Sequence, residues 1–82
     1  MHSIEFTQTA EKQFNKLPRD IQIRIVRVLE RIKFRPFHFI KRKEGTPYFI
    51  LRIGNYRVIL NIQIEDSLIY VMEIGHRKHI YD

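Results

Sequence analysis

The sequence has no cysteine among its 82 residues, so neither disulfides nor thiolate chemistry is available to it. No apolar stretch approaches the ~20 residues of a membrane-spanning helix, and the first residues lack the basic and apolar segments of a secretory signal. Internal repeats, low-complexity tracts and Gly/Ser linkers are also missing. These absences predict a single cytoplasmic domain, residues 1–82, that does not associate with membranes.

Acidic residues are scarce relative to basic ones. Nine Asp and Glu stand against fifteen Lys and Arg, which gives a net charge of +6 and a pI near 10.0. Such an excess favours a polyanionic partner, either a nucleic acid or an acidic protein. The four histidines are scattered and no carboxylate cluster accompanies them, so we expect neither a metal site nor a cofactor.

Turn residues are absent from residues 21–32, which favours regular structure there. Residues Ser3–Phe6 alternate in polarity and predict a strand, after which Thr7 or Thr9 caps a helix ended by Pro18. Residues Ile21–Ile32 begin with a strand-like alternation but also carry a helical apolar stripe, and their uninterrupted length favours a helix. Residues 34–45 are expected to form a basic loop that contains Lys41, Arg42 and Lys43.

From residue 48 the apolar period changes to two. Tyr48–Ile53, Tyr56–Ile64 and Leu68–Ile74 predict three antiparallel strands, and Gly54 and Asn55 predict a two-residue hairpin turn of type II′. The predicted fold class is therefore α+β, with an N-terminal strand and two helices packed on one face of an antiparallel β-meander.

The hairpin fixes the strand register and therefore the two faces of the sheet. We expect one face to pack on the helices and to hold Phe49, Leu51, Ile53, Tyr56, Val58, Leu60, Ile62 and Ile64. A three-residue loop at 65–67 would add Leu68, Tyr70, Met72 and Ile74 to it, whereas a two-residue loop would bury Glu73. The opposite face is expected to carry Tyr48, Ile50, Arg52, Arg57, Ile59, Asn61, Glu73 and Arg77.

Arg52 and Arg57 are predicted to lie directly opposite each other, an arrangement that destabilises a sheet. A bound phosphate would explain the pair, because guanidinium groups grip phosphate oxygens in a bidentate fork; alternatively Glu73 and Glu44 neutralise it, or both side chains extend into solvent. A second set of arginines, at 24, 27 and 31, shares one face of the second helix. That face is either solvated or binds an anionic partner.

Two stretches together resemble the RelE/ParE toxin superfamily: residues 51–59, LRIGNYRVI, and residues 75–81, GHRKHIY. Residues 10–18, AEKQFNKLP, are similar to the first helix of that family, and Lys43-Glu44-Gly45 to its loop before the hairpin. The resemblance covers nearly the whole chain and implies a RelE-like fold. It also implies a cognate antitoxin that binds tightly.

The resemblance implies one of two activities: mRNA cleavage on the ribosome, with A-site mRNA as substrate, or inhibition of DNA gyrase in the ParE branch. By position, Arg57 and Arg77 resemble the phosphate-binding arginines of the family and Tyr81 its C-terminal tyrosine, the catalytic set we predict. Arg52, Lys43, Arg42 and Lys41 are the predicted phosphate-binding set. The strand before the hairpin, residues 48–51, carries no lysine, unlike many ribosome-dependent relatives.

Cleavage of RNA needs no metal, because the 2′-hydroxyl is the nucleophile; it needs alignment, a base, an acid and positive charge for the phosphorane. Arg57 and Arg77 would supply that charge, and Tyr81 is a candidate base if cations lower its pKa. We therefore predict a ribosome-dependent, metal-independent mRNA endoribonuclease toxin. A gyrase-inhibiting toxin without nuclease activity and a non-catalytic nucleic-acid-binding module are the alternatives.

Overall fold

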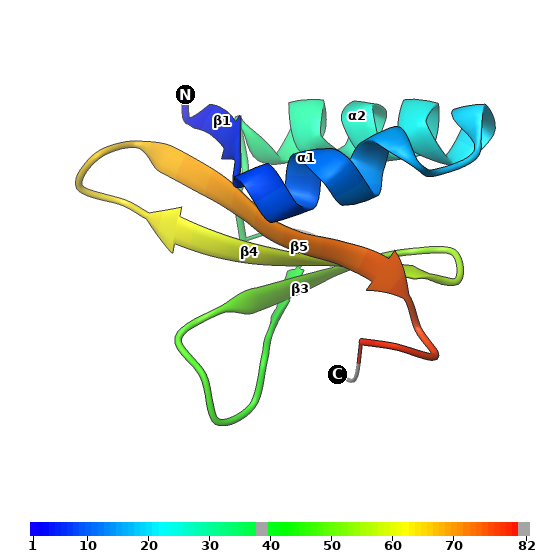
Figure 1. The fold of residues 1–82 in the computed structure, drawn as a ribbon. Helices are drawn as coiled ribbons and strands as arrows, with labels where there is room; N and C mark the ends of the chain where they lie inside the picture. Colours follow the sequence, from blue (N-terminus) through cyan, green and yellow to red (C-terminus); the bar gives the residue numbers. More distant parts are fainter. Residues whose placement is uncertain (38–39, 81–82) are drawn as a thin grey trace.

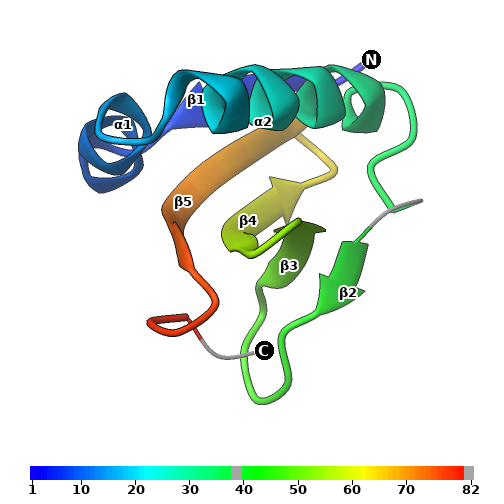
Figure 2. The ribbon, with the colours of Figure 1, turned by 90° about the vertical axis from the view of Figure 1, so that its right-hand side faces the viewer.

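Two helices cover one face of a five-stranded sheet in the computed structural model, which describes residues 1–37 and 40–80 (Figure 1, Figure 2). The elements, in chain order, are β1 (Ser3–Phe6), α1 (Gln8–Asn15), α2 (Arg19–Ile32), β2 (Ile40–Arg42), β3 (Phe49–Ile53), β4 (Tyr56–Gln63) and β5 (Leu68–His76). The strand order across the sheet is β1-β5-β4-β3-β2. The predicted α+β class is confirmed, although β1 pairs in parallel with β5 and makes the sheet mixed rather than purely antiparallel.

Both predicted helices form, and each is positioned by its own sequence. The hydroxyl of Thr7 accepts a hydrogen bond from the Ala10 N–H (3.1 Å) and so caps α1. Pro18 precedes α2 as its N-cap. The apolar stripe of α2 faces the sheet, with Ile25, Leu29 and Ile32 buried, which confirms the helical interpretation of this segment.

The main core lies between the helices and the sheet. Its strand residues include Leu51 and Ile53 from β3 and Val58 and Leu60 from β4, each at most 3% exposed. The hairpin register is as predicted, with Arg52 opposite Arg57 and Ile53 opposite Tyr56. Gly54 has a φ of +57°, as the first central position of a type II′ turn requires. Ile64, expected in the core, lies beyond β4 and is 63% exposed.

The face assignment for β5 is wrong over most of its length, because the strand contains a β-bulge. Leu60 pairs with Val71 but Ile59 pairs with Glu73, so Met72 is an extra residue. Before the bulge, Ile69 and Val71 enter the core in place of the predicted Leu68, Tyr70 and Met72. After it, Ile74 is buried and Glu73 exposed, as expected.

The predicted basic loop at 34–45 is partly wrong as well. Residues 40–42 form β2, an antiparallel edge strand in which Lys41 pairs with Ile50 and Arg42 with Phe49. Two of the three clustered cations therefore stand on a strand and point to opposite faces of the sheet. Residues 38–39 and 81–82 lie outside the described part of the chain, so the prediction for Tyr81 falls there.

Candidate functional site

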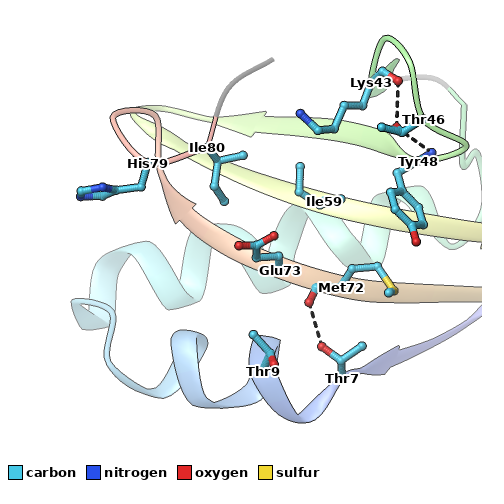
Figure 3. A pocket seen from close by; sticks show the side chains of 10 residues that line it. All are labelled: Thr7, Thr9, Lys43, Thr46, Tyr48, Ile59, Met72, Glu73, His79 and Ile80. Atoms are coloured by element: carbon cyan, nitrogen blue, oxygen red, sulfur yellow. Dashed lines mark hydrogen bonds between the residues drawn. The ribbon is translucent and has the colours of Figure 1, made fainter.

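A groove of about 690 Å³ opens on the outer face of the sheet, the face opposite the helices (Figure 3). Strands β4 and β5 form its floor, the β2–β3 turn lies on one side, and the start of α1 lies on the other. Its lining combines apolar residues with a carboxylate, an ammonium and a phenol. The lining residues are Thr7, Thr9, Lys43, Thr46, Tyr48, Ile59, Met72, Glu73, His79 and Ile80.

A small apolar cluster forms the floor of this groove. Ile50 and Ile59 project from the outer face of the sheet, and Ile80 packs on them from the segment that follows β5. Figure 3 shows Ile80 beside Ile59. Ile80 reaches this position because Gly75 has no side chain: a Cβ there would stand 2.9 Å from Ile80 Cδ1. Tyr48 and Met72 pack against the same cluster. The outer face is therefore partly apolar, with Ile50 and Ile59 on it as the register predicted and Ile80 added from the segment after β5.

Lys43 is positioned by a compact turn between β2 and β3. Its N–H donates to the Tyr48 carbonyl (2.9 Å), and its own carbonyl accepts from the Thr46 hydroxyl (2.9 Å) and the Thr46 N–H (3.1 Å). The Thr46 hydroxyl in turn accepts from the Tyr48 N–H (3.2 Å), and Gly45 provides the positive φ of +79°. Figure 3 shows the Lys43 side chain extending over the groove. This position suits the phosphate-binding role that we expect of Lys43.

The β-bulge delivers Glu73 to the other side of the groove. Thr7 holds the bulge, because its N–H donates to the Val71 carbonyl (3.0 Å) and its hydroxyl donates to the Met72 carbonyl (2.8 Å). The Glu73 side chain then points into the groove, whereas the ring of His79 points away from its centre (Figure 3). Glu73 was expected on this face only as a partner for the arginines. Its place in the groove depends on the bulge, which no local sequence pattern indicates.

Arg57 is on the outer face, two residues before Ile59 on β4, so it borders the groove without lining it. Its Nη1 donates to the carbonyls of Gly54 and Tyr56, each at 3.0 Å, and this fixes the guanidinium against the hairpin turn. Arg52 stands across from it on β3 and is exposed. The structure thus brings these two predicted residues together at the hairpin end of the groove.

Arg77 lies just beyond β5, in a turn that returns the chain to the outer face. Its N–H donates to the Asn55 carbonyl (2.7 Å), and the N–H groups of His79 (2.8 Å) and Ile80 (3.1 Å) donate to the His76 carbonyl. These bonds place Arg77 beside the hairpin turn that also anchors Arg57. The two predicted catalytic arginines therefore meet at one end of the sheet, whereas the third member of that set, Tyr81, is outside the described residues.

Lys41 and Arg42, the two cations of β2, point to opposite faces of the sheet. Lys41 shares the outer face with Ile50, its cross-strand partner, and extends the row Ile50, Ile59 and Glu73 to the edge of the sheet. Arg42 points to the helix side instead, where its guanidinium carbon lies 5.9 Å from the centre of the Phe49 ring. Of the predicted phosphate-binding set, Lys41, Lys43 and Arg52 are on the outer face and Arg42 is not.

The positive charge at this end of the sheet acts on His76. Partial burial lowers the pKa of His76 below its usual 6.5, and the nearby charges of Lys78, Arg77, His79 and Arg57 lower it further. The imidazole stands edge-on to Tyr56 with 5.5 Å between ring centres, and its Nδ1 accepts from the Lys78 N–H (3.2 Å). The site is therefore an anion-attracting region with a neutral imidazole at its border.

The chemistry open to this arrangement is acid–base catalysis beside a bound anion. Glu73 offers a proton acceptor, Lys43 a cation, and Arg57 and Arg77 further positive charge at the border. Within residues 1–37 and 40–80, three or more His, Asp or Glu side chains nowhere gather as a metal site would need. In the same residues, no helix is long and apolar enough to cross a membrane.

The strand–helix–helix–meander architecture defines a class, because it is that of the RelE toxins in solved toxin–antitoxin complexes. Residues 4–81 match the family model described as the ParE toxin of type II toxin–antitoxin systems, and the chain belongs to this family. It is 29% identical over 83 residues to Toxin RelG of Mycobacterium tuberculosis, covering 98% of this chain and 95% of that protein.

Solved structures agree with this membership. A chain of the RelBE2 toxin–antitoxin complex of M. tuberculosis superposes with a TM-score of 0.82 at 28% identity, covering 93% of this chain and 98% of the other. A chain of the RelB–RelE complex of Methanococcus jannaschii gives a TM-score of 0.75 at 28% identity, with 94% of each chain covered. The protein is thus a toxin of the RelE/ParE type from a type II toxin–antitoxin system.

Proposed function

We propose that this toxin is a ribosome-dependent, metal-independent mRNA endoribonuclease that inhibits translation. The observation that carries the proposal is the outer-face groove, in which Lys43 and Glu73 face the same space while Arg57 and Arg77 stand at its border. An RNA phosphate at this border would be held by cations on two sides. A carboxylate would be within the same groove to receive the proton of the 2′-hydroxyl.

The proposed reaction needs only groups of the protein and the RNA. Glu73 or Tyr81 takes the proton of the 2′-hydroxyl, whose oxygen attacks the adjacent phosphorus and forms a phosphorane. Arg57, Arg77 and Lys43 offset the added negative charge, an effect that mutagenesis of comparable groups puts at about 2.7–4 kcal/mol. The P–O5′ bond then breaks, and the leaving oxygen takes a proton from the Lys43 ammonium, which yields a 2′,3′-cyclic phosphate and a 5′-hydroxyl.

The ribosome is proposed as the component that aligns the message. The strand before the hairpin carries Phe49, Ile50 and Leu51 and no lysine, so the groove by itself holds few groups that would orient RNA. Good orientation of reactants is worth on the order of 7–11 kcal/mol, more than one carboxylate or phenol supplies. We therefore expect cleavage of A-site mRNA on ribosomes and almost none of free RNA.

Primer extension on programmed ribosomes, with EDTA-treated protein and naked RNA in parallel, tests the proposal. We expect codon-positioned cuts on ribosomes only, and a roughly 100- to 1000-fold loss of rate in Arg57→Ala and Arg77→Ala. Arg19→Ala, which removes an exposed cation from the start of α2, is the matched control and should cut normally. Glu73→Gln and Tyr81→Phe then separate the two candidate bases.

Inhibition of DNA gyrase is the second candidate function. It is favoured by the family model, which is that of the ParE toxin, and by the missing lysine on β3. Uncut message on the ribosome, together with stalled DNA replication in cells that express the toxin, would replace the nuclease proposal with this one.

A further inference from the structure

We infer that a second pocket, between α2 and the β3–β4 hairpin, binds a backbone phosphate of RNA; the inference rests on the proposed function in taking RNA as the partner. The pocket has a volume of about 320 Å³. Four of its seven lining residues are arginines: Arg24, Arg27 and Arg31 of α2, and Arg52 of β3. It is separate from the outer-face groove, with which it shares no lining residue.

The three helix arginines place like charges next to one another on one face of α2. Arg24 and Arg27 are three residues apart and Arg27 and Arg31 four, so neighbouring side chains on one face bear like charges. Such pairs destabilise a helix by about 0.2–0.5 kcal/mol each. Of the described residues that line the pocket, none is acidic. An anion from outside the chain would compensate this repulsion.

The pocket is also shaped before any ligand arrives. The guanidinium of Arg24 packs on the hairpin turn, with Nη1, Nη2 and Cζ at 3.2, 3.5 and 3.7 Å from the place where a Cβ of residue 54 would stand. Only glycine leaves this space open while also adopting the φ of +57°. Val28 and Ile53 line the pocket beside the arginines, whose side chains are exposed and so accessible to a ligand.

RNA is favoured over an acidic protein segment because the cations continue out of the pocket. Arg52 lines the pocket and is also the cross-strand partner of Arg57 on the outer face. Arg77 lies on the far side of the same hairpin turn, through its bond to Asn55. The result is a line of arginines around the end of the sheet, from α2 to the border of the groove. A strand with one negative charge per nucleotide matches such a line, because several of its phosphates meet cations in succession.

Binding of a short single-stranded RNA made uncleavable by 2′-O-methylation tests the inference by fluorescence anisotropy over a range of salt concentrations. The pocket variant is Arg27→Gln/Arg31→Gln; the control, Lys12→Gln/Arg19→Gln, removes the same charge from exposed helix positions outside the pocket. We expect the pocket variant to bind at least about tenfold more weakly and to lower the slope of log Kd against log salt by about 0.7 for each phosphate that the pocket no longer neutralises. The control should lose less affinity.

Three results would overturn the inference: no RNA binding by the wild-type protein, equal reductions of affinity in both variants, or a pocket variant that keeps its RNA affinity but no longer binds a partner protein. Matching thermal unfolding of the two variants excludes a folding defect. Failure of the proposed function is distinguishable, because RNA binding that depends on the pocket together with uncut message on ribosomes would retain the pocket and reject the nuclease.

Discussion

His76 reports on the charge of the site, because the charges of Lys78, Arg77 and Arg57 add to burial in lowering its pKa. We predict an NMR titration midpoint below 6.5 for its imidazole, and a rise in that midpoint when RNA or polyphosphate occupies the border of the groove, because the anion neutralises those charges. Lys78→Ala should also raise it. If the titration midpoint of His76 does not change when a polyanion is added, the polyanion binds elsewhere.

The lowered pKa of His76 also makes the free energy of unfolding depend on pH. Because the folded state holds the proton of His76 less tightly than the unfolded state does, protonation favours unfolding. This residue should therefore add to stability as pH rises from the lowered folded pKa to 6.5, and contribute nothing further above that value. His76→Gln should flatten this part of the pH profile in urea denaturation.

At the scale of elements, the segment after β5 is held to the sheet chiefly by one side chain. Ile80 is 8% exposed and covers Ile50 and Ile59. We predict that Ile80→Ala lowers the free energy of unfolding by about 2 kcal/mol, the lower end for a buried isoleucine. Ile64→Ala makes the same chemical change at a side chain that is 63% exposed, so it should alter stability by less than about 0.5 kcal/mol.

Gly75→Ala should act in the same direction as Ile80→Ala, since its new methyl group would occupy the space of Ile80 Cδ1. If urea denaturation gave both Ile80→Ala and Gly75→Ala the same midpoint as the wild type, the small apolar cluster on the outer face would not contribute to stability.

Local sequence patterns predicted the elements whose structure depends on residues close together in the chain. The two-residue turn at Gly54 fixed the register of β3 and β4, and with it the place of Arg52 opposite Arg57. The bulge at Met72 was not predictable in this way, because Thr7, 65 residues away, holds it by a hydrogen bond. β2 has three residues, too few for a period to be read. The groove was missed for these reasons: the bulge positions Glu73, and the return of Ile80 depends on a contact across the sheet.

At the scale of the whole molecule, the chain carries a net charge of +6, and four of its arginines line one pocket at the hairpin end. Both solved relatives described above come from toxin–antitoxin complexes, and we propose a cognate antitoxin for this toxin too. Its segment over Arg52 and Arg57 should be acidic, and the association rate should fall as salt rises, because screening weakens long-range attraction. Stopped-flow mixing at several ionic strengths measures this. A basic antitoxin segment over these arginines would contradict it.

The pairing of β1 with β5 also determines when the folded sheet can form during synthesis. Residues 3–6 leave the ribosome early, yet their strand partners are residues 68–71. During synthesis α1 and α2 can form early, but the sheet on which they pack lacks its central contacts until β4 and β5 have emerged. Contacts so distant in sequence also form slowly. The groove and its arginine border therefore form only after residues 68–80 have emerged, because β5 supplies Glu73 and the turn after it carries Arg77.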